Sequence, residues 1–167
     1  MKIENKLLFG GDGNEIILFV TGEATMSMAP ALKKFIWDIL DAGHNQLSEL
    51  RINLKDCHYM DSTFIGTILI VTRKLFDDCG LKCEIVKPSV FCRKTLISMG
   101  LIDLLPINDE YEYEGEKFPI SMRSLDKLAK SKLLYNAHKE LSEVNEENRR
   151  MFELVLDCLK KSMDNNH

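Results

Sequence analysis

A serine that follows an aspartate at the predicted start of a helix is the clearest candidate for chemistry in this chain. The segment Met60-Asp61-Ser62-Thr63 precedes a stretch whose apolar residues recur with a period near 3.6 residues. Aspartate and serine are preferred at helix N-termini, because their side-chain oxygens accept hydrogen bonds from the first unpaired backbone N–H groups. The simplest interpretation of Asp61 and Ser62 is therefore a structural helix cap.

A second interpretation of Ser62 starts from the same helix end. Unpaired N–H groups and the positive end of the helix dipole would stabilise a phosphate on its hydroxyl. Such a phosphate adds roughly −1.5 to −2 charges at pH 7. Because Asp61 is already negative, the modified site would repel a partner that places carboxylates or apolar surface over Ser62. The pattern predicts a switch between two binding states.

Signatures of catalysis and of metal binding are missing from the sequence. It contains no phosphate-binding P-loop, no glycine-rich dinucleotide motif and no serine-hydrolase elbow. The histidines are scattered at His44, His58, His138 and His167, and only His58 lies close to the predicted site. The cysteines form no C-x-x-C pair and have no metal-ligand spacing. We expect a protein that is not an enzyme and that holds no metal and no cofactor.

Composition narrows the class of partner and the compartment. The chain has 167 residues and a net charge of −4, which argues against direct binding of nucleic acid. No apolar stretch approaches the ~18 residues of a membrane span, and the N-terminus does not resemble a signal peptide. Five cysteines, an odd number without paired spacing, fit a reducing compartment. We expect a cytoplasmic protein that does not insert into membranes.

Short apolar runs alternate with helix-like stretches over residues 1–107. Strands are predicted at 6–9, 15–21, 50–54, 83–86 and 104–107, and helices at 29–41, from Asp61 or Ser62 to Gly80, and at 89–99. This alternation predicts an α/β domain in which helices pack on a central β-sheet.

The rest of the chain is predicted to be an acidic linker, residues 108–120, followed by a C-terminal helical extension, residues 121–167. Residues 121–163 contain no glycine or proline and carry one apolar stripe, which predicts a single long amphipathic helix, unless Asn145 caps a second helix. The stripe folds back on the domain, self-associates or docks into a partner. For a homodimer we expect contacts at Leu141, Val144, Asn148, Met151 and Val155, with Asn148 setting the register.

Three motifs in register resemble the STAS domain of anti-sigma factor antagonists. Residues 54–66 resemble the signature in which an aspartate, the phosphorylated serine, a serine or threonine and Gly-x-Gly follow a core strand. Residues 20–23, Val-Thr-Gly-Glu, resemble a family strand that ends in Gly-Glu-Leu-Asp, and residues 98–101 resemble its closing Ser-Gly-Leu segment. The matches cover about residues 5–107 and imply a STAS-like central β-sheet with helices packed on it.

The resemblance implies a partner-switching protein. Unphosphorylated members bind an anti-sigma factor that is also a GHKL-type serine kinase, and phosphorylation of the serine breaks that complex. A PP2C-type phosphatase restores it. Ser62 matches the phosphorylated serine, Asp61 the aspartate before it and Thr63 the hydroxyl residue after it. The alternative is a STAS scaffold subunit of a sensory or transport assembly, in which Ser62 only caps the helix.

The chain departs from the family pattern at two places. Phe64 replaces the first glycine of the signature, and Ala24-Thr25 replace Leu-Asp after Gly22-Glu23. Phe64 either packs in the core or widens an apolar docking patch with Met26, Met28 and Met60. These departures imply either a kinase that differs from those of the best-known members or another partner. The partner face is predicted to comprise Glu23, Thr25, Met26, Met60, Asp61, Thr63 and Phe64.

Overall fold

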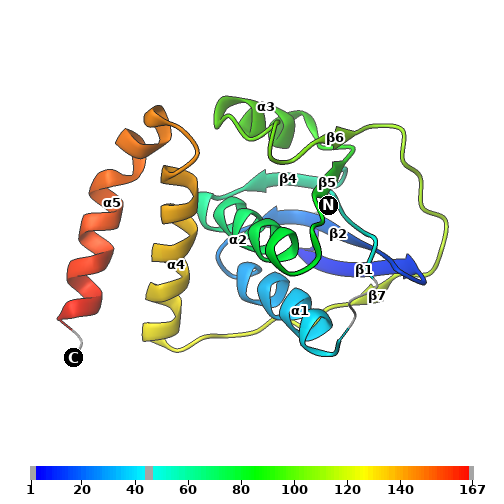
Figure 1. Ribbon diagram of the computed structural model, residues 1–167, viewed down its shortest axis with the longest axis horizontal. Coiled ribbons are helices and arrows are strands. Elements are labelled where there is room, and N and C mark those ends of the chain that lie inside the picture. The colour runs from blue at the N-terminus through cyan, green and yellow to red at the C-terminus, as the bar shows by residue number, and fades with distance from the viewer. Residues whose placement is uncertain (1–2, 44–46, 166–167) are drawn as a thin grey trace.

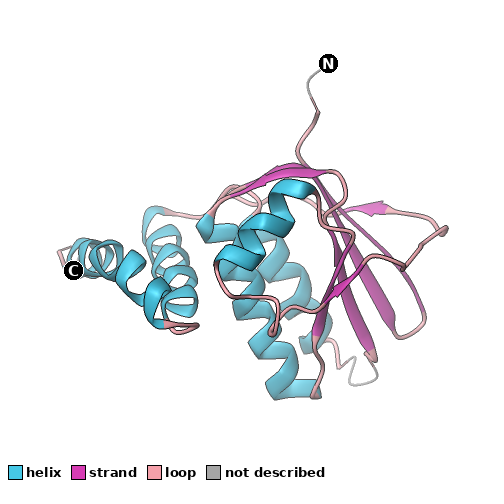
Figure 2. Cartoon of the chain, turned by 90° about the horizontal axis from the view of Figure 1, so that it is seen from above, coloured by secondary structure: helices cyan, strands magenta, loops and turns pink. Residues whose placement is uncertain are grey.

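A mixed β-sheet covered by helices on one face forms the centre of the molecule (Figures 1 and 2). The computed structural model describes residues 3–43 and 47–165, so His44 and His167 lie outside the described residues. The strands are β1 (Lys6–Asp12), β2 (Glu15–Ala24), β3 (Glu49–Asn53), β4 (Cys57–Met60), β5 (Cys83–Val86), β6 (Ile107–Asn108) and β7 (Phe118–Pro119). The helices are α1 (Ala29–Asp41), α2 (Ser62–Cys79), α3 (Val90–Ser98), α4 (Lys127–Ser142) and α5 (Glu146–Asp164).

The strand order is β6-β5-β3-β2-β1-β7, and β4 pairs with the far end of β2. β1 pairs antiparallel with β2 and β7, whereas β2, β3, β5 and β6 run parallel to one another. Helices connect the parallel strands β2, β3 and β5, as parallel pairing in one sheet requires crossover connections. The predicted α/β class with a STAS-like central sheet is confirmed. The last predicted strand is shifted, because only Ile107 of the stretch 104–107 pairs with β5.

The central strand β2 is buried on both faces of the sheet. Leu18 and Val20 join the main core with side chains of α1 and α2, whereas Ile17 and Phe19 belong to a smaller cluster on the opposite face. Successive side chains of a strand point to opposite faces, so one strand supplies both clusters. β2 thereby anchors the helices that carry the candidate site.

A bulge at Gly22 brings the end of β2 beside β4. The register shifts between Gly22 and Glu23, and Gly22 has φ +84°, a conformation that favours glycine. A Cβ at this position would lie 2.3 Å from Oδ1 of Asn5. Beyond the bulge Ala24 pairs with Met60, which places the loop before α1 next to the start of α2.

The segment 108–120 lies on the far face of the sheet. Tyr111 and Tyr113 pack against the smaller core cluster, and Tyr113 accepts a hydrogen bond from the backbone N–H of Gly11 at 3.0 Å. The guanidinium of Arg51 lies 4.1 Å from the ring centre of Tyr111. The stretch predicted as a linker therefore covers apolar surface that would otherwise be open, and it ends in β7 at the sheet edge.

The C-terminal extension forms two helices, so the prediction of a single long helix is wrong. The chain turns at residues 143–145, where Oδ1 of Asn145 accepts a hydrogen bond from the N–H of Asn148 at 2.7 Å. This is the cap that the alternative prediction assigned to Asn145. Figure 1 shows α4 crossing the start of α2, with α5 packed on the side of α4 that faces away from the domain.

Candidate functional site

Asp61 caps α2 and connects it to the loop after β2. One carboxylate oxygen accepts a hydrogen bond from the N–H of Phe64 at 2.8 Å, and the other accepts one from the N–H of Met26 at 2.9 Å. The N–H of Asp61 donates to the carbonyl of Ala24 at 2.9 Å. The cap interpretation is confirmed for Asp61, which leaves Ser62 as the first helical residue with its hydroxyl free for another role.

The hydroxyl of Ser62 is hydrogen-bonded to a side chain of the C-terminal extension. Its Oγ lies 2.9 Å from Nε2 of His138 on α4, and Nδ1 of the same ring lies 2.6 Å from the carbonyl oxygen of Leu134. A carbonyl oxygen only accepts, so these partners assign the proton of the neutral ring to Nδ1. Nε2 of His138 then accepts the hydrogen bond that the Ser62 hydroxyl donates.

His138 is enclosed between the domain and α5. Its side chain is only 6% exposed, and its ring centre lies 5.4 Å from that of Phe152 on α5. Phe152 itself is buried in the main core cluster. The α4–α5 hairpin therefore holds the imidazole against the start of α2.

One turn further along α2, Gly66 allows the two helices to touch through their backbones. A Cβ at Gly66 would lie 2.2 Å from the carbonyl oxygen of Ala137 on α4. Gly66 is the second glycine of the signature motif, and here its missing side chain makes room for α4. Beneath this contact α4 buries Leu133, Ala137 and Leu141, whose spacing of four residues places them on one helix face.

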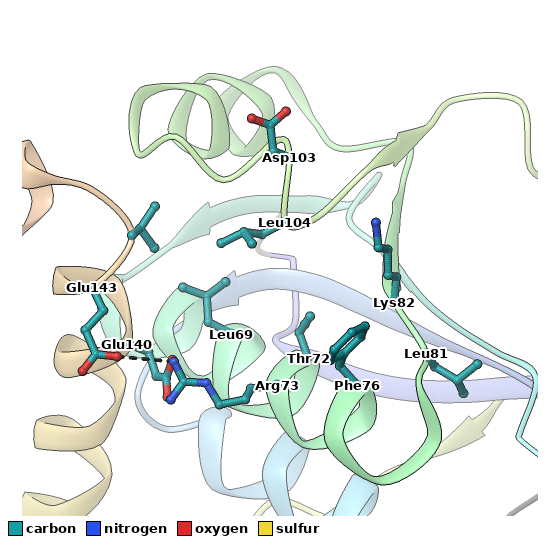
Figure 3. A pocket seen from close by; sticks show the side chains of 11 residues that line it. Leu69, Thr72, Arg73, Phe76, Leu81, Lys82, Asp103, Leu104, Glu140 and Glu143 are labelled. Atoms are coloured by element: carbon teal, nitrogen blue, oxygen red, sulfur yellow. Dashed lines mark hydrogen bonds and ion pairs between the residues drawn. The ribbon is translucent and has the colours of Figure 1, made fainter.

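An ion-pair cluster ends the contact between α2 and α4 (Figure 3). Arg73 on α2 places Nη1 2.8 Å from Oε1 of Glu140 and Nη2 3.3 Å from Oε2 of Glu143. Burial raises the pKa of Glu140, and the positive charge of Arg73 opposes that rise only in part. Desolvation of Glu140 therefore outweighs its attraction to Arg73, which is 56% exposed.

A serine hydroxyl, an imidazole and an orienting carbonyl form the same sequence of contacts as an activated nucleophile and its base. The cavity next to Arg73 and a second cavity between α1 and α4 are lined by other residues, and neither includes Ser62 or His138. The geometry fits a contact that attaches α4 to the start of α2.

Only part of the predicted partner face is at the surface. Glu23 is exposed, and Thr25, Met26 and Asp61 are half-buried. By contrast, Met60, Thr63 and Phe64 are buried, and Met60 and Phe64 belong to the main core cluster. The predicted docking patch of Phe64 with Met26, Met28 and Met60 is therefore absent from the surface, and Phe64 packs in the core as the alternative predicted.

The residues predicted to mediate self-association have different environments. Leu141 and Asn148 are buried within the chain, and Val144 is half-buried against the core. Nδ2 of Asn148 donates to the carbonyl of Met99 at 3.0 Å, so this side chain links α5 to the end of α3 instead of setting a coiled-coil register. Met151 and Val155 remain exposed on α5.

The cysteines are free thiols in the described part of the chain. Cys57, Cys83 and Cys92 are buried, and burial raises the pKa of Cys83 to about 12, which keeps its thiol protonated. Across residues 3–43 and 47–165 no group of three or more histidine, cysteine, aspartate or glutamate side chains is placed to hold a metal ion. None of the helices in those ranges has the length and apolar character of a membrane span.

His138 is the site residue that sequence reasoning missed. In the sequence His138 is one of four scattered histidines, and its partner Ser62 is 76 residues away. The signal that marks it is a polar side chain within the apolar stripe of the extension, directly after Ala137 and three residues before Leu141. A polar residue at such a position requires a hydrogen-bond partner once it is buried.

Comparisons with known proteins agree with this architecture. A family model described as the STAS domain matches residues 10–113. A solved structure from Thermotoga maritima, described as an anti-sigma factor antagonist, is 22% identical and superposes with a TM-score of 0.54 over 60% of this chain and 84% of its own. No curated protein matches the chain.

Two structures of SpoIIAA have the same fold. The unphosphorylated form of this anti-sigma factor antagonist is 18% identical, with a TM-score of 0.51 over 62% of this chain and 89% of its own. The phosphorylated form, from Bacillus, is 19% identical, with a TM-score of 0.50 over 62% and 92% of the two chains. The matching family model covers more than half of the sequence, and the chain belongs to the STAS domain family.

Proposed function

We propose that this protein is an anti-sigma factor antagonist controlled by phosphorylation of Ser62. The observation that carries the proposal is the placement of the Ser62 hydroxyl in the first turn of α2, directly after the capping carboxylate of Asp61, in a STAS domain. The solved structures of SpoIIAA, an anti-sigma factor antagonist of the same fold, include an unphosphorylated and a phosphorylated form.

The physical basis of the switch is local charge. A phosphate on Ser62 adds roughly −1.5 to −2 charges at pH 7 beside the carboxylate of Asp61. In the unphosphorylated protein the exposed part of the predicted partner face, Glu23, Thr25, Met26 and Asp61, carries two carboxylates. The phosphate roughly doubles the negative charge of this small area, which repels a partner that tolerates the unmodified face.

The proposed partner of the unphosphorylated form is an anti-sigma factor of the GHKL serine-kinase type, and a PP2C-type phosphatase reverses the modification. In this scheme the protein acts by binding in the cytoplasm and catalyses no reaction. It contacts neither nucleic acid nor membrane directly. Met60, Thr63 and Phe64 support the partner face from below, since they fix the first turn of α2.

Residues 1–107 form the STAS domain, 108–120 its connecting segment and 121–167 the helical extension. A homodimer forms through the outer face of α5, where Met151, Leu154 and Val155 are exposed. Leu141 and Asn148 take no part in such a dimer while the hairpin is docked, because they are buried within the chain.

A second candidate function is a STAS scaffold whose serine is not phosphorylated. The observation that favours it is the hydrogen bond between Ser62 and His138, which occupies the hydroxyl and lies under α4. In this case the pair attaches the extension to the domain, and partners bind elsewhere on a sensory or transport assembly.

Incubation with ATP and each GHKL-type kinase encoded in the same genome separates the two functions. The switch predicts phosphate on Ser62, located by mass spectrometry of the digested protein, and its loss in Ser62→Ala. Thr63→Ala is the matched control, since it removes the neighbouring hydroxyl, which is buried, and leaves Ser62 in place. Absence of label from every kinase, together with normal partner binding by Ser62→Asp, would support the scaffold.

A further inference from the structure

The face of α2 that α4 covers has the features of a helix-binding surface, and we infer that a partner helix takes the place of α4 on it. We call this face the α2 seat and define it by Ser62, Gly66 and Arg73, each of which contacts α4. The inference rests on the proposed partner-switching function, because it specifies how the partner reaches the start of α2.

The three residues of the α2 seat lie at spacings of four and seven, so they share one side of the helix. Their partners lie close together on α4: His138 contacts Ser62, Ala137 contacts Gly66 and Glu140 contacts Arg73. The α2 seat thus fits a helix that carries a small residue, then a hydrogen-bond acceptor at the next position, and an acidic residue two positions later. A partner helix that fits it carries this same pattern.

α4 lies outside the segment that matches the family, and an exposed segment without helix or strand joins it to the domain. The family match ends at residue 113, before α4 begins at Lys127. Residues 121–126 form neither helix nor strand, and all but Leu125 are exposed. A helix that follows such a connection can leave the domain while the sheet and α2 remain folded.

The contact between α4 and α2 is incompletely filled at its Arg73 end. A cavity of about 470 Å³ lies there, and Figure 3 shows it bounded by Leu69, Phe76 and Leu104 of the domain and by Glu140 and Glu143 of α4. Phe76 is 55% exposed on the same side of α2, one turn beyond Arg73. A partner helix with an apolar side chain at this point would bury Phe76 and fill space that α4 leaves open.

Occupation of the α2 seat also controls access to Ser62. While α4 is docked, Ser62 is half-buried and Nε2 of His138 lies 2.9 Å from its Oγ, so the imidazole occupies the space beside the hydroxyl. A kinase therefore reaches the hydroxyl only after α4 has moved. Once present, the phosphate prevents α4 and any helix of the same pattern from returning to the seat.

A peptide with the sequence of residues 124–145, labelled with a fluorophore, tests the exchange on the full-length protein. Docked α4 is present at an effective concentration in the millimolar range, so the peptide should bind the unmodified protein weakly. Ala137→Glu in the full-length chain weakens the docking of α4 and leaves the α2 seat unchanged. We expect the peptide to bind this variant at least tenfold more tightly, measured by fluorescence anisotropy.

Matched variants show whether the peptide occupies the α2 seat. Adding Gly66→Ala to Ala137→Glu should abolish the gain, because the new Cβ fills the space that the backbone at Ala137 needs. Lys139→Glu, at an exposed position of α4, should leave peptide binding as weak as in the unmodified protein. A folded Ala137→Glu variant that binds the peptide no better than the unmodified protein would overturn the inference.

Hydrogen exchange of the unmodified protein gives an independent answer, also if Ala137→Glu fails to fold. We expect the slowest amides of α4 to exchange at least tenfold faster than those of β2 and β3. Equal protection in α4 and in these strands would mean that α4 leaves only on global unfolding, and the inference would be wrong. Neither measurement uses a kinase, so a failure here is distinguishable from an absence of phosphate on Ser62.

Discussion

The two ends of the contact between α2 and α4 differ in how closely they are packed. At the Ser62 end the imidazole is buried and the backbones of the two helices meet at Gly66. At the Arg73 end the arginine side chain is 56% exposed, and a cavity lies beside the ion pairs that join the helices. The difference indicates that the contacts of α4 with Ser62 and Gly66 contribute most to its docking on α2, and that the ion pairs of Arg73 contribute less.

The largest expected effect is at Gly66. Alanine in place of an exposed helical glycine stabilises a helix by about 0.5–1 kcal/mol. At Gly66 the new Cβ would lie 2.2 Å from a backbone oxygen of α4, which has no flexible end to move aside. We therefore expect Gly66→Ala to lower the free energy of unfolding by about 1–3 kcal/mol, measured by urea denaturation.

Asp77→Ala is a suitable control for Gly66→Ala, because Asp77 is exposed on the same helix. Its expected change is within about 0.5 kcal/mol. If Gly66→Ala stabilised the protein, the close approach of α4 to α2 would not exist in solution, and the two ends of the contact would be equivalent.

The periodic parts of the sequence predicted their structure well. The helical period after Asp61 and the apolar strand of residues 15–21 correspond to α2 and β2. One face of each packs in the main core cluster, and the other face of β2 packs in the smaller cluster. Asp61 was predictable as a cap because the interaction is local: its partner Phe64 is three residues away.

The parts that depend on distant partners were not predictable in the same way. β4 has only four residues, and its two middle side chains are both exposed, so no alternation marks it. The stripe of α4 showed that Ala137 and Leu141 would be buried, but not what they would pack against. The contact of Gly66 with α4 and the bond of Ser62 to His138 arise only when α4 docks on α2.

The second effect concerns the hydrogen bond between Ser62 and His138. Removing one member leaves the other without its partner, and we expect Ser62→Ala and His138→Ala each to cost about 1–2 kcal/mol. The double variant should cost less than the sum, with a coupling of about 0.5–1.5 kcal/mol. Additive losses in this double-mutant cycle, measured by denaturation, would show that the two side chains do not interact.

A smaller effect is expected at the other end of α2. Arg73 is 56% exposed, and exposed ion pairs contribute about 0–1 kcal/mol. Arg73→Ala should therefore lower the free energy of unfolding by less than either variant at the Ser62–His138 pair. A loss from Arg73→Ala that exceeds that of His138→Ala would reverse the ranking of the two ends.

The smallest effect is at Glu140 and appears as a dependence on pH. Burial raises the pKa of this carboxyl in the folded protein above its usual value near 4.5, so the folded state binds a proton more readily than the unfolded state. Glu140 therefore stabilises the folded protein at pH values below its usual pKa. This stabilisation is lost as the pH rises through the raised pKa. Glu140→Gln has no such proton to bind.

The difference in unfolding free energy between the unmodified protein and Glu140→Gln should therefore shift toward the unmodified protein as the pH is lowered through that window. At neutral pH the variant loses the ion pair with Arg73 but also avoids the desolvation of a carboxylate, and the two changes oppose each other. A difference that is constant with pH would mean that Glu140 is as well solvated in the folded protein as in the unfolded chain. The Arg73 end would then be open to water throughout, and the docking of α4 would rest on Ser62, Gly66 and the buried stripe alone.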